Sequence, residues 1–159
     1  MFFAVLTVSD RCSQGLLIDT AGPSVVALLR QHWLDAEIQT ALVPDDEPAI
    51  AAQLNQWAAH GAALVLTVGG TGLSRRDRTP EATLSVIDRE VPGLAEAMRS
   101  LGAERNPYAW LSRGVAGLKG STLIINLPGS QRGAEQSLAS IVALLEHGLE
   151  IAAGGQTHP

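Results

Sequence analysis

Three continuous runs of apolar residues constrain the fold of this chain more than any other feature. They are Phe2–Val8, Ala62–Val68 and Thr122–Leu127, and each stops abruptly at a polar or glycine-rich turn. Strands that are buried on both faces have such runs, whereas half-exposed strands alternate apolar and polar residues. A fourth run, Glu37–Val43, alternates less cleanly and ends at Pro44. The runs predict a parallel sheet with helices on both faces.

Helical segments are predicted between these strands. Apolar residues recur at helical spacing after Gly22-Pro23-Ser24 and after Asp46-Glu47-Pro48. Thr79-Pro80-Glu81 has the form of a helix cap followed by proline in the first turn. Two further helices are predicted at 93–103 and at about 133–151. This order of elements predicts an α/β protein, a three-layer αβα fold whose open, mostly parallel sheet has right-handed crossovers.

The length of 159 residues suits one domain, which we place at 1–153, with 154–159 as a flexible C-terminal tail. The net charge of −5 argues against a general nucleic-acid binder. No apolar run approaches the roughly 20 residues of a membrane span, so we expect no membrane partner. The N-terminus reads as a strand rather than a signal peptide, and Cys12 is the only cysteine. Both observations favour the cytoplasm.

Polar and glycine-rich segments follow the four predicted strands, where open α/β sheets bind their ligands. These segments are Ser9-Asp10, Asp45-Asp46, Gly69-Gly70-Thr71-Gly72 and Pro128-Gly129-Ser130. Because the carboxyl ends of parallel strands lie at one edge of a sheet, we expect the four segments to meet in one crevice.

The Gly69–Gly72 turn is a candidate phosphate site, because backbone N–H groups at a strand end followed by a helix favour anions. Its alternative is a tight turn that uses glycine only for positive φ. Neither a Walker A loop nor a GxGxxG fingerprint is present. Asp77 follows this turn among Arg75, Arg76 and Arg78. An acid at a phosphate site predicts a magnesium ion, and the alternative is a solvated charge cluster.

Other candidates have equally plain alternatives. Asp46 is expected to cap a helix, whereas Asp45 either faces the crevice or belongs to the same cap. Pro128-Gly129-Ser130 is either a second phosphate-binding loop or a simple turn between a strand and a helix. Ser112-Arg113 either contacts an anion or lies in a surface loop. The four histidines show no HxH or HExxH spacing and Cys12 has no CxxC partner. A zinc site or a redox function is therefore not predicted.

Taken together, the motifs resemble those of the MogA/MoaB family, which has the molybdopterin-binding fold. The resemblance covers residues 3–153 and is most specific in TVGGTGLSRRDRTPEAT, LSRGVAGLKGSTLIINLPGS, TVSDR, DTAGP, VPDD and PGLAEAMR. One departure is Ala21, where many members have serine. The short length is closer to MoaB than to MogA.

The resemblance implies a molybdopterin adenylyltransferase, which uses Mg²⁺ and ATP to adenylylate molybdopterin in molybdenum cofactor biosynthesis. It implies that Asp45 and Asp77 are catalytic and that Asp77 is linked to the metal. The implied binding residues are Ser9, Asp10, Gly69, Gly70, Thr71, Gly72, Ser112, Arg113, Pro128, Gly129 and Ser130.

The resemblance also implies a homotrimer or hexamer, and a molybdenum-insertion protein that receives the product. Two alternatives remain. One is a non-catalytic MoaB-like module that binds molybdopterin or a nucleotide, and the other is a nucleotide-binding α/β protein unrelated to molybdenum.

Overall fold

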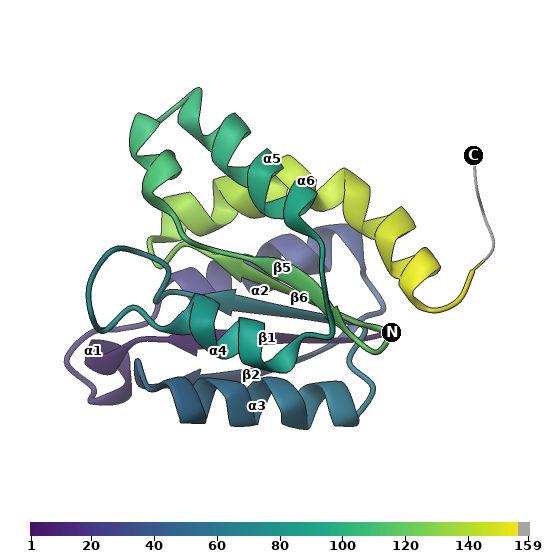
Figure 1. Ribbon diagram of the computed structural model, residues 1–159, viewed down its shortest axis with the longest axis horizontal. Coiled ribbons are helices and arrows are strands. Elements are labelled where there is room, and N and C mark those ends of the chain that lie inside the picture. Colours follow the sequence, from purple (N-terminus) through teal and green to yellow (C-terminus); the bar gives the residue numbers. More distant parts are fainter. Residues whose placement is uncertain (156–159) are drawn as a thin grey trace.

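The computed structural model describes residues 1–155 (Figure 1). Its strands are β1 (Phe2–Val8), β2 (Glu37–Val43), β3 (Leu64–Val68), β4 (Arg89–Glu90), β5 (Ala116–Lys119) and β6 (Thr122–Leu127). Its helices are α1 (Asp10–Ser13), α2 (Ala21–His32), α3 (Glu47–Ala59), α4 (Thr79–Val86), α5 (Pro92–Ala103), the 3₁₀ helix η1 (Pro107–Leu111) and α6 (Gln131–Ala152).

The strands form one six-stranded sheet in the order β2-β1-β3-β6-β5-β4. The first four strands in this order are mutually parallel, whereas β5 and β4 are antiparallel to their neighbours. Val8 pairs with Val43, and Val68 pairs with both Thr7 and Leu127, so the four parallel strands end at the same level. The mostly parallel sheet that the apolar runs predict is confirmed.

Helices cover both faces of the sheet, as Figure 1 shows. On one face, α2, α5 and α6 bury a core that includes Leu29, Met98 and Leu138. On the other face, α3 and α4 bury Leu54 and Trp57 among the residues of a second core. The strands between them are almost wholly apolar because both of their faces lie against helices.

Three predictions at the ends of elements need correction. The third strand begins at Leu64, two residues later than predicted, and the last helix begins at Gln131 rather than at about 133. Thr79 is the first residue of α4 and not its cap; its hydroxyl donates instead to the carbonyl oxygen of Gly69, at 2.9 Å. Asp46 caps α3 as expected, because its carboxylate accepts from the Ala49 N–H.

The predicted tail at 154–159 falls mostly on residues 156–159, which lie outside the described part of the chain. Within residues 1–155, no helix combines the length and the hydropathy that crossing a lipid bilayer requires.

Candidate functional site

The candidate site lies beyond the carboxyl ends of β1 and β3, where the chain direction across the sheet reverses. From β1 the chain passes to β2 on one side, whereas β3 and β6 lie on the other side. Ligands of open α/β sheets bind at such switch points, because the loops diverge there and leave a crevice. A cavity of about 190 Å³ occupies this place. Residues that line it include Ser9, Asp45, Gly69, Gly70, Asp77 and Gly129.

This cavity brings together the four strand-end segments that the sequence placed in one crevice. Asp45 and Asp77, which come from the ends of β2 and of the glycine loop, both line it. A volume of about 190 Å³ is smaller than the 300–1,000 Å³ of typical small-molecule pockets. The cavity is therefore large enough for a phosphate group, and the rest of a nucleotide would lie outside it, at its opening to solvent.

The glycine turn forms one wall of the cavity with its backbone. Gly69 has φ +110° and Gly70 has φ +64°, a region that residues with a side chain rarely adopt. A Cβ atom on Gly69 would lie 2.3 Å from the Val8 carbonyl oxygen, and one on Gly70 would lie 2.3 Å from the Thr79 hydroxyl. Both positions therefore need glycine for the φ angle and for the close approach of neighbouring backbone.

Asp10 and Asp45 hold each other in place. The Asp10 N–H donates to Oδ2 of Asp45 at 2.8 Å, and the Asp45 N–H donates to Oδ1 of Asp10 at 3.0 Å. This reciprocal pair joins the ends of β1 and β2 and leaves Oδ1 of Asp45 on the side of Gly70. Asp10 does not line the cavity itself and contacts Asp45, which does.

Asp77 is oriented by its own loop. Its Oδ2 accepts from the Ser74 N–H at 2.9 Å, and its N–H donates to the Ser74 carbonyl oxygen at 3.0 Å. Gly72 passes so close that a Cβ atom there would lie 2.9 Å from Oδ2 of Asp77. The loop therefore fixes the direction of the carboxylate through backbone contacts.

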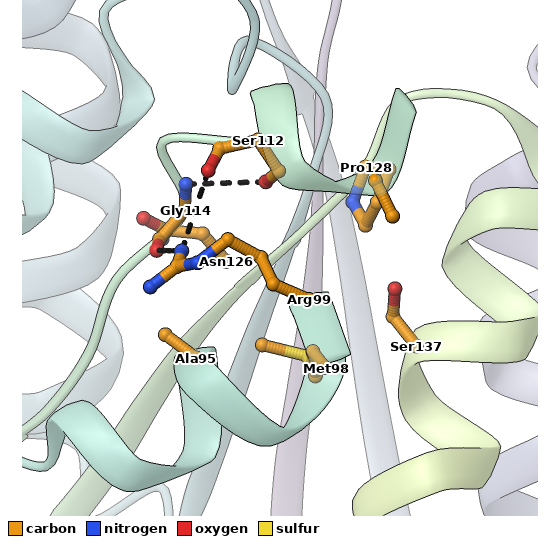
Figure 2. Close-up of a pocket in the computed structure, with 9 residues that line it drawn as sticks. Ala95, Met98, Arg99, Ser112, Gly114, Asn126, Pro128 and Ser137 are labelled. Carbon is orange, nitrogen blue, oxygen red and sulfur yellow. Dashed lines mark hydrogen bonds between the residues drawn. The ribbon is translucent and has the colours of Figure 1, made fainter. Parts of the chain in front are cut away.

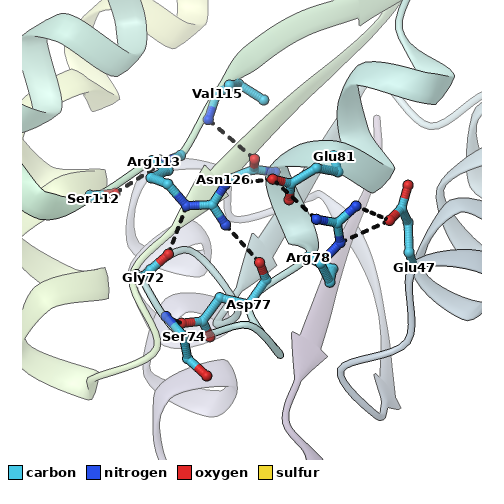
Figure 3. A network of polar contacts seen from close by, with 11 residues as sticks. Glu47, Gly72, Ser74, Asp77, Arg78, Glu81, Ser112, Arg113, Val115 and Asn126 are labelled. Carbon is cyan, nitrogen blue, oxygen red and sulfur yellow. Dashed lines mark hydrogen bonds and ion pairs between the residues drawn. The ribbon is translucent and has the colours of Figure 1, made fainter.

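Two of the three arginines beside Asp77 are engaged with acids. Arg76 donates twice to Asp10, at 2.8 and 2.9 Å, and Arg78 donates to Glu47 at 2.7 Å (Figure 3 shows the second contact). Arg75 is exposed and, within residues 1–155, it forms no ion pair. Of the three arginines, Arg75 is thus the one whose charge is available to a ligand in this structure.

Several of the candidate residues lie outside the cavity. Ser130 caps α6, since its hydroxyl accepts from the Gly133 N–H at 3.1 Å. Ser112 and Pro128 line a separate cavity of about 30 Å³ between α5 and α6 (Figure 2), which has room for about one water molecule. Thr71 and Gly72 belong to the loop, and Arg113 contacts that loop rather than the cavity.

Sequence reasoning missed the segment between α1 and α2. Leu17, Ile18, Asp19 and Ala21 line the cavity, and Ile18 is 84% exposed. Asp19 accepts from the Thr7 hydroxyl at 2.6 Å and from the Gly22 N–H at 2.9 Å, so it fixes this segment against β1. The available signal was the DTAGP motif at Asp19–Pro23, which resembles the family but was not assigned to the site.

A larger groove of about 560 Å³ lies between α2 and β2. Thr7 and Asp19 line both this groove and the candidate site, so the two hollows share one wall.

Burial raises the pKa of Asp45, and the nearby carboxylates of Asp10 and Asp77 raise it further, against the hydrogen bond from the Asp10 N–H and the charge of Arg76. A cation between Asp45 and Asp77 would relieve this repulsion.

Within residues 1–155, no group of three or more acidic, histidine or cysteine side chains is arranged to hold a metal. Two carboxylates fit Mg²⁺, which takes one or two from the protein and its other ligands from phosphate and water.

Comparisons with known proteins identify the family to which the chain is similar. Residues 4–147 match the family described as "Probable molybdopterin binding domain". The chain is 41% identical to the molybdopterin adenylyltransferase of Haemophilus influenzae over 139 residues, which cover 86% of this chain and 71% of that protein. It is 37% identical to the molybdenum cofactor synthesis protein cinnamon of Drosophila melanogaster, covering 94% of this chain but only 25% of that protein.

A solved structure is also similar. The crystal structure of the molybdopterin biosynthesis enzyme MoaB from Thermus thermophilus superimposes with a TM-score of 0.88 at 47% identity, and the match covers 96% of both chains.

Proposed function

Because the chain belongs to the molybdopterin-binding domain family, we propose that it is a molybdopterin adenylyltransferase of molybdenum cofactor biosynthesis. It transfers AMP from ATP to the terminal phosphate of molybdopterin and releases pyrophosphate. The observation that carries the proposal is the position of Asp45 and Asp77, which line one cavity with the backbone of Gly69 and Gly70 at the switch point of the sheet.

The reaction joins two polyanions, so catalysis depends on positioning and on charge neutralisation. A phosphate oxygen of molybdopterin attacks the α-phosphorus of ATP, and the bond from this phosphorus to the bridging oxygen breaks. The electron pair of that bond leaves with pyrophosphate, so no protein nucleophile is needed.

The Gly69 N–H already donates to the Leu127 carbonyl oxygen, at 3.1 Å. In this proposal the backbone N–H of Gly70 therefore binds a phosphate oxygen, and Arg75 approaches the phosphate from the loop. Asp77 and Asp45 are the residues that would hold Mg²⁺, and a bound Mg²⁺ would supply positive charge next to the phosphates. Ser9 and Gly129 also line the cavity.

We extend the proposal to the setting of the enzyme. A single domain at 1–153 works in the cytoplasm as a homotrimer, and it passes the adenylylated product to a molybdenum-insertion protein. These points rest on the family and on the sequence.

The experiment that tests the proposed function mixes the purified protein with ATP, Mg²⁺ and molybdopterin. We expect pyrophosphate and adenylylated molybdopterin in equal amounts, measured by a coupled phosphate assay and by mass spectrometry. Dephosphorylated molybdopterin is the matched control substrate, and it should give neither product because it lacks the attacking oxygen.

Two results would overturn this proposal. Binding of molybdopterin in calorimetry without consumption of ATP would identify a non-catalytic binding module. No affinity for molybdopterin at all would point to a nucleotide-binding protein outside this pathway.

A further inference from the structure

The loop that carries Asp77 is exposed along most of its length. Leu73 is 67% exposed, and Ser74, Arg75 and Arg76 are also exposed. A loop without a core of its own is mobile unless contacts from elsewhere hold it. A carboxylate that binds a metal during catalysis must be held to within about 0.5 Å of its working position. Some other part of the chain must therefore fix this loop.

We propose that Arg113 is the positioning residue for Asp77. Its guanidinium donates through Nε to the Gly72 carbonyl oxygen at 2.8 Å and through Nη2 to the Asp77 carbonyl oxygen at 2.6 Å (Figure 3). Its own N–H donates to the Thr71 carbonyl oxygen at 2.9 Å. One residue thus ties the start and the end of the loop, and it contacts the backbone of the residue whose carboxylate faces the cavity.

Arg113 is itself held from two sides. Its Nη1 donates to Oε1 of Glu81 on α4, and Arg78 lies 3.7 Å from the same oxygen while it binds Glu47 on α3. Two arginines and two glutamates therefore form a line of alternating charge across the back of the loop, which Figure 3 shows.

The backbone on either side of Arg113 is fixed by a second arginine. Arg99 on α5 donates to the carbonyl oxygens of Ser112 and Gly114, at 3.3 and 2.9 Å (Figure 2). The residues before and after Arg113 are therefore attached to the helical layer, and Arg113 transmits this rigid attachment to the loop.

The geometry separates this role from direct binding of substrate. All three nitrogens of the guanidinium already donate to the protein, and Arg113 is not among the residues that line the cavity. The planar fork of arginine can serve two carbonyls and a carboxylate at once, whereas a lysine ammonium cannot reproduce this arrangement. Arg113→Lys is thus a variant that keeps the charge and removes the geometry.

The catalytic consequence of this inference rests on the proposed adenylyl transfer, but the structural consequence does not. The experiment therefore has two arms and compares Arg113→Lys and Arg113→Met with the wild type. The control is Arg105→Met, at an exposed arginine two residues after the end of α5.

The first arm measures hydrogen exchange of the amides in residues 72–78 without substrate. We expect exchange there to rise about tenfold in both Arg113 variants, because opening of the loop no longer breaks the contacts to Gly72 and Asp77. The chain outside the loop and α4 should exchange as the wild type does, and so should the whole Arg105 variant. Unchanged exchange in the loop would overturn the inference whether or not the protein transfers AMP.

The second arm measures kinetics as a function of Mg²⁺. We expect kcat to fall about 10- to 100-fold and the Mg²⁺ concentration for half activation to rise, because the group that orients a metal ligand is lost. KM for molybdopterin should stay within about threefold, because Arg113 does not touch it. An unchanged kcat with a raised KM would instead identify Arg113 as a substrate-binding residue and would overturn the inference.

A double variant separates positioning from simple loss of charge balance. In Arg113→Met, Glu81 keeps a charge that lacks its main partner, which by itself would destabilise α4. Adding Glu81→Gln removes this charge and should restore thermal stability, while kcat stays low and loop exchange stays fast. Recovery of kcat in the double variant would contradict a positioning role. Absence of pyrophosphate release by the wild type would refute the proposed function and leave the exchange arm to decide the inference.

Discussion

At the scale of single residues, Asp77 carries the sharpest prediction. Asp77→Asn keeps the size of the side chain and an oxygen that can accept from the Ser74 N–H, but it removes the negative charge that a metal ion needs. We expect kcat to fall by at least about 100-fold, with KM for molybdopterin nearly unchanged, because the interaction acts mainly in the transition state.

The control for this variant is Asp35→Asn, at an exposed aspartate outside the site, which should behave as the wild type. Calorimetry with molybdopterin supplies the binding constant. If Asp77→Asn weakens binding of molybdopterin as much as it slows turnover, the metal role of Asp77 is wrong.

The acids of the site could be predicted from the sequence, whereas the partners of its arginines could not. Asp45 follows a strand and Asp77 follows a glycine turn, so each position is a local property of the chain. The contact of Arg76 with Asp10 joins residues 66 positions apart, and the contact of Arg113 with Asp77 joins residues 36 positions apart. Such contacts depend on how loops fold back, and a single sequence has no local signal for them.

At the scale of elements, the turn after β3 passes so close to the end of β1 that it needs glycine at position 69. Gly69→Ala would place a methyl group at φ +110° and 2.3 Å from the Val8 carbonyl oxygen. We expect a loss of more than about 2 kcal/mol in the free energy of unfolding, because both backbone strain and a clash oppose the change.

Gly61→Ala is the matched comparison for this turn. Gly61 also has a positive φ, of +80°, but nothing lies within 4 Å of the position of a Cβ atom. Strain alone should cost about 1 kcal/mol there. Urea denaturation measures both variants, and equal losses would mean that the close approach to β1 contributes nothing.

The short antiparallel strands show which elements the sequence could not predict. Three of the four long parallel strands have continuous apolar runs, and β2 has an imperfectly alternating one, so the sequence predicts all four. In contrast, β5 has four residues, β4 has two, and neither is long enough for a periodic pattern. Gly117 in β5 is explained only by packing, since a Cβ atom there would lie 2.4 Å from Cδ1 of Ile87.

At the scale of the whole molecule, ion pairs between loops predict how stability depends on pH. Hydrogen bonds from Arg76 lower the pKa of Asp10, and those from Arg113 lower the pKa of Glu81. A carboxyl group with a lowered pKa in the folded protein stabilises it above the unfolded pKa, and this contribution is lost as the pH falls through the folded value. Asp45 has a raised pKa and acts in the opposite direction.

Hydrogen bonds from the Gly120 N–H and from Lys119 lower the pKa of Asp88 as well, so three carboxyl groups have a lowered pKa and one has a raised pKa. We therefore expect the midpoint of urea denaturation to decrease as the pH falls below about 4. Arg76→Met should reduce this dependence because the pKa of Asp10 then returns toward its ordinary value. Arg105→Met should leave it unchanged. A dependence on pH that is the same in all three proteins would exclude the Arg76–Asp10 pair as its source.

The proposed homotrimer is tested at this scale too. Light scattering should give about 50 kDa, three times the chain mass of 16.7 kDa. The groove beside the edge strand β2 is lined by Val26, Ala27, Ala41 and Leu42, and it offers apolar surface that an assembly would cover. A particle of 16.7 kDa would rule the trimer out.

The close contact between the backbones of Gly69 and Gly129 also limits how the ligand preference of this protein can change through substitutions. A Cβ atom on Gly129 would lie 3.2 Å from Cα of Gly69, so the floor of the crevice consists of bare main chain from two turns. Natural variation and laboratory selection cannot reshape such a floor by exchanging side chains. New ligand preferences would have to arise at the rim, where Leu17 and Ile18 are exposed and free to change.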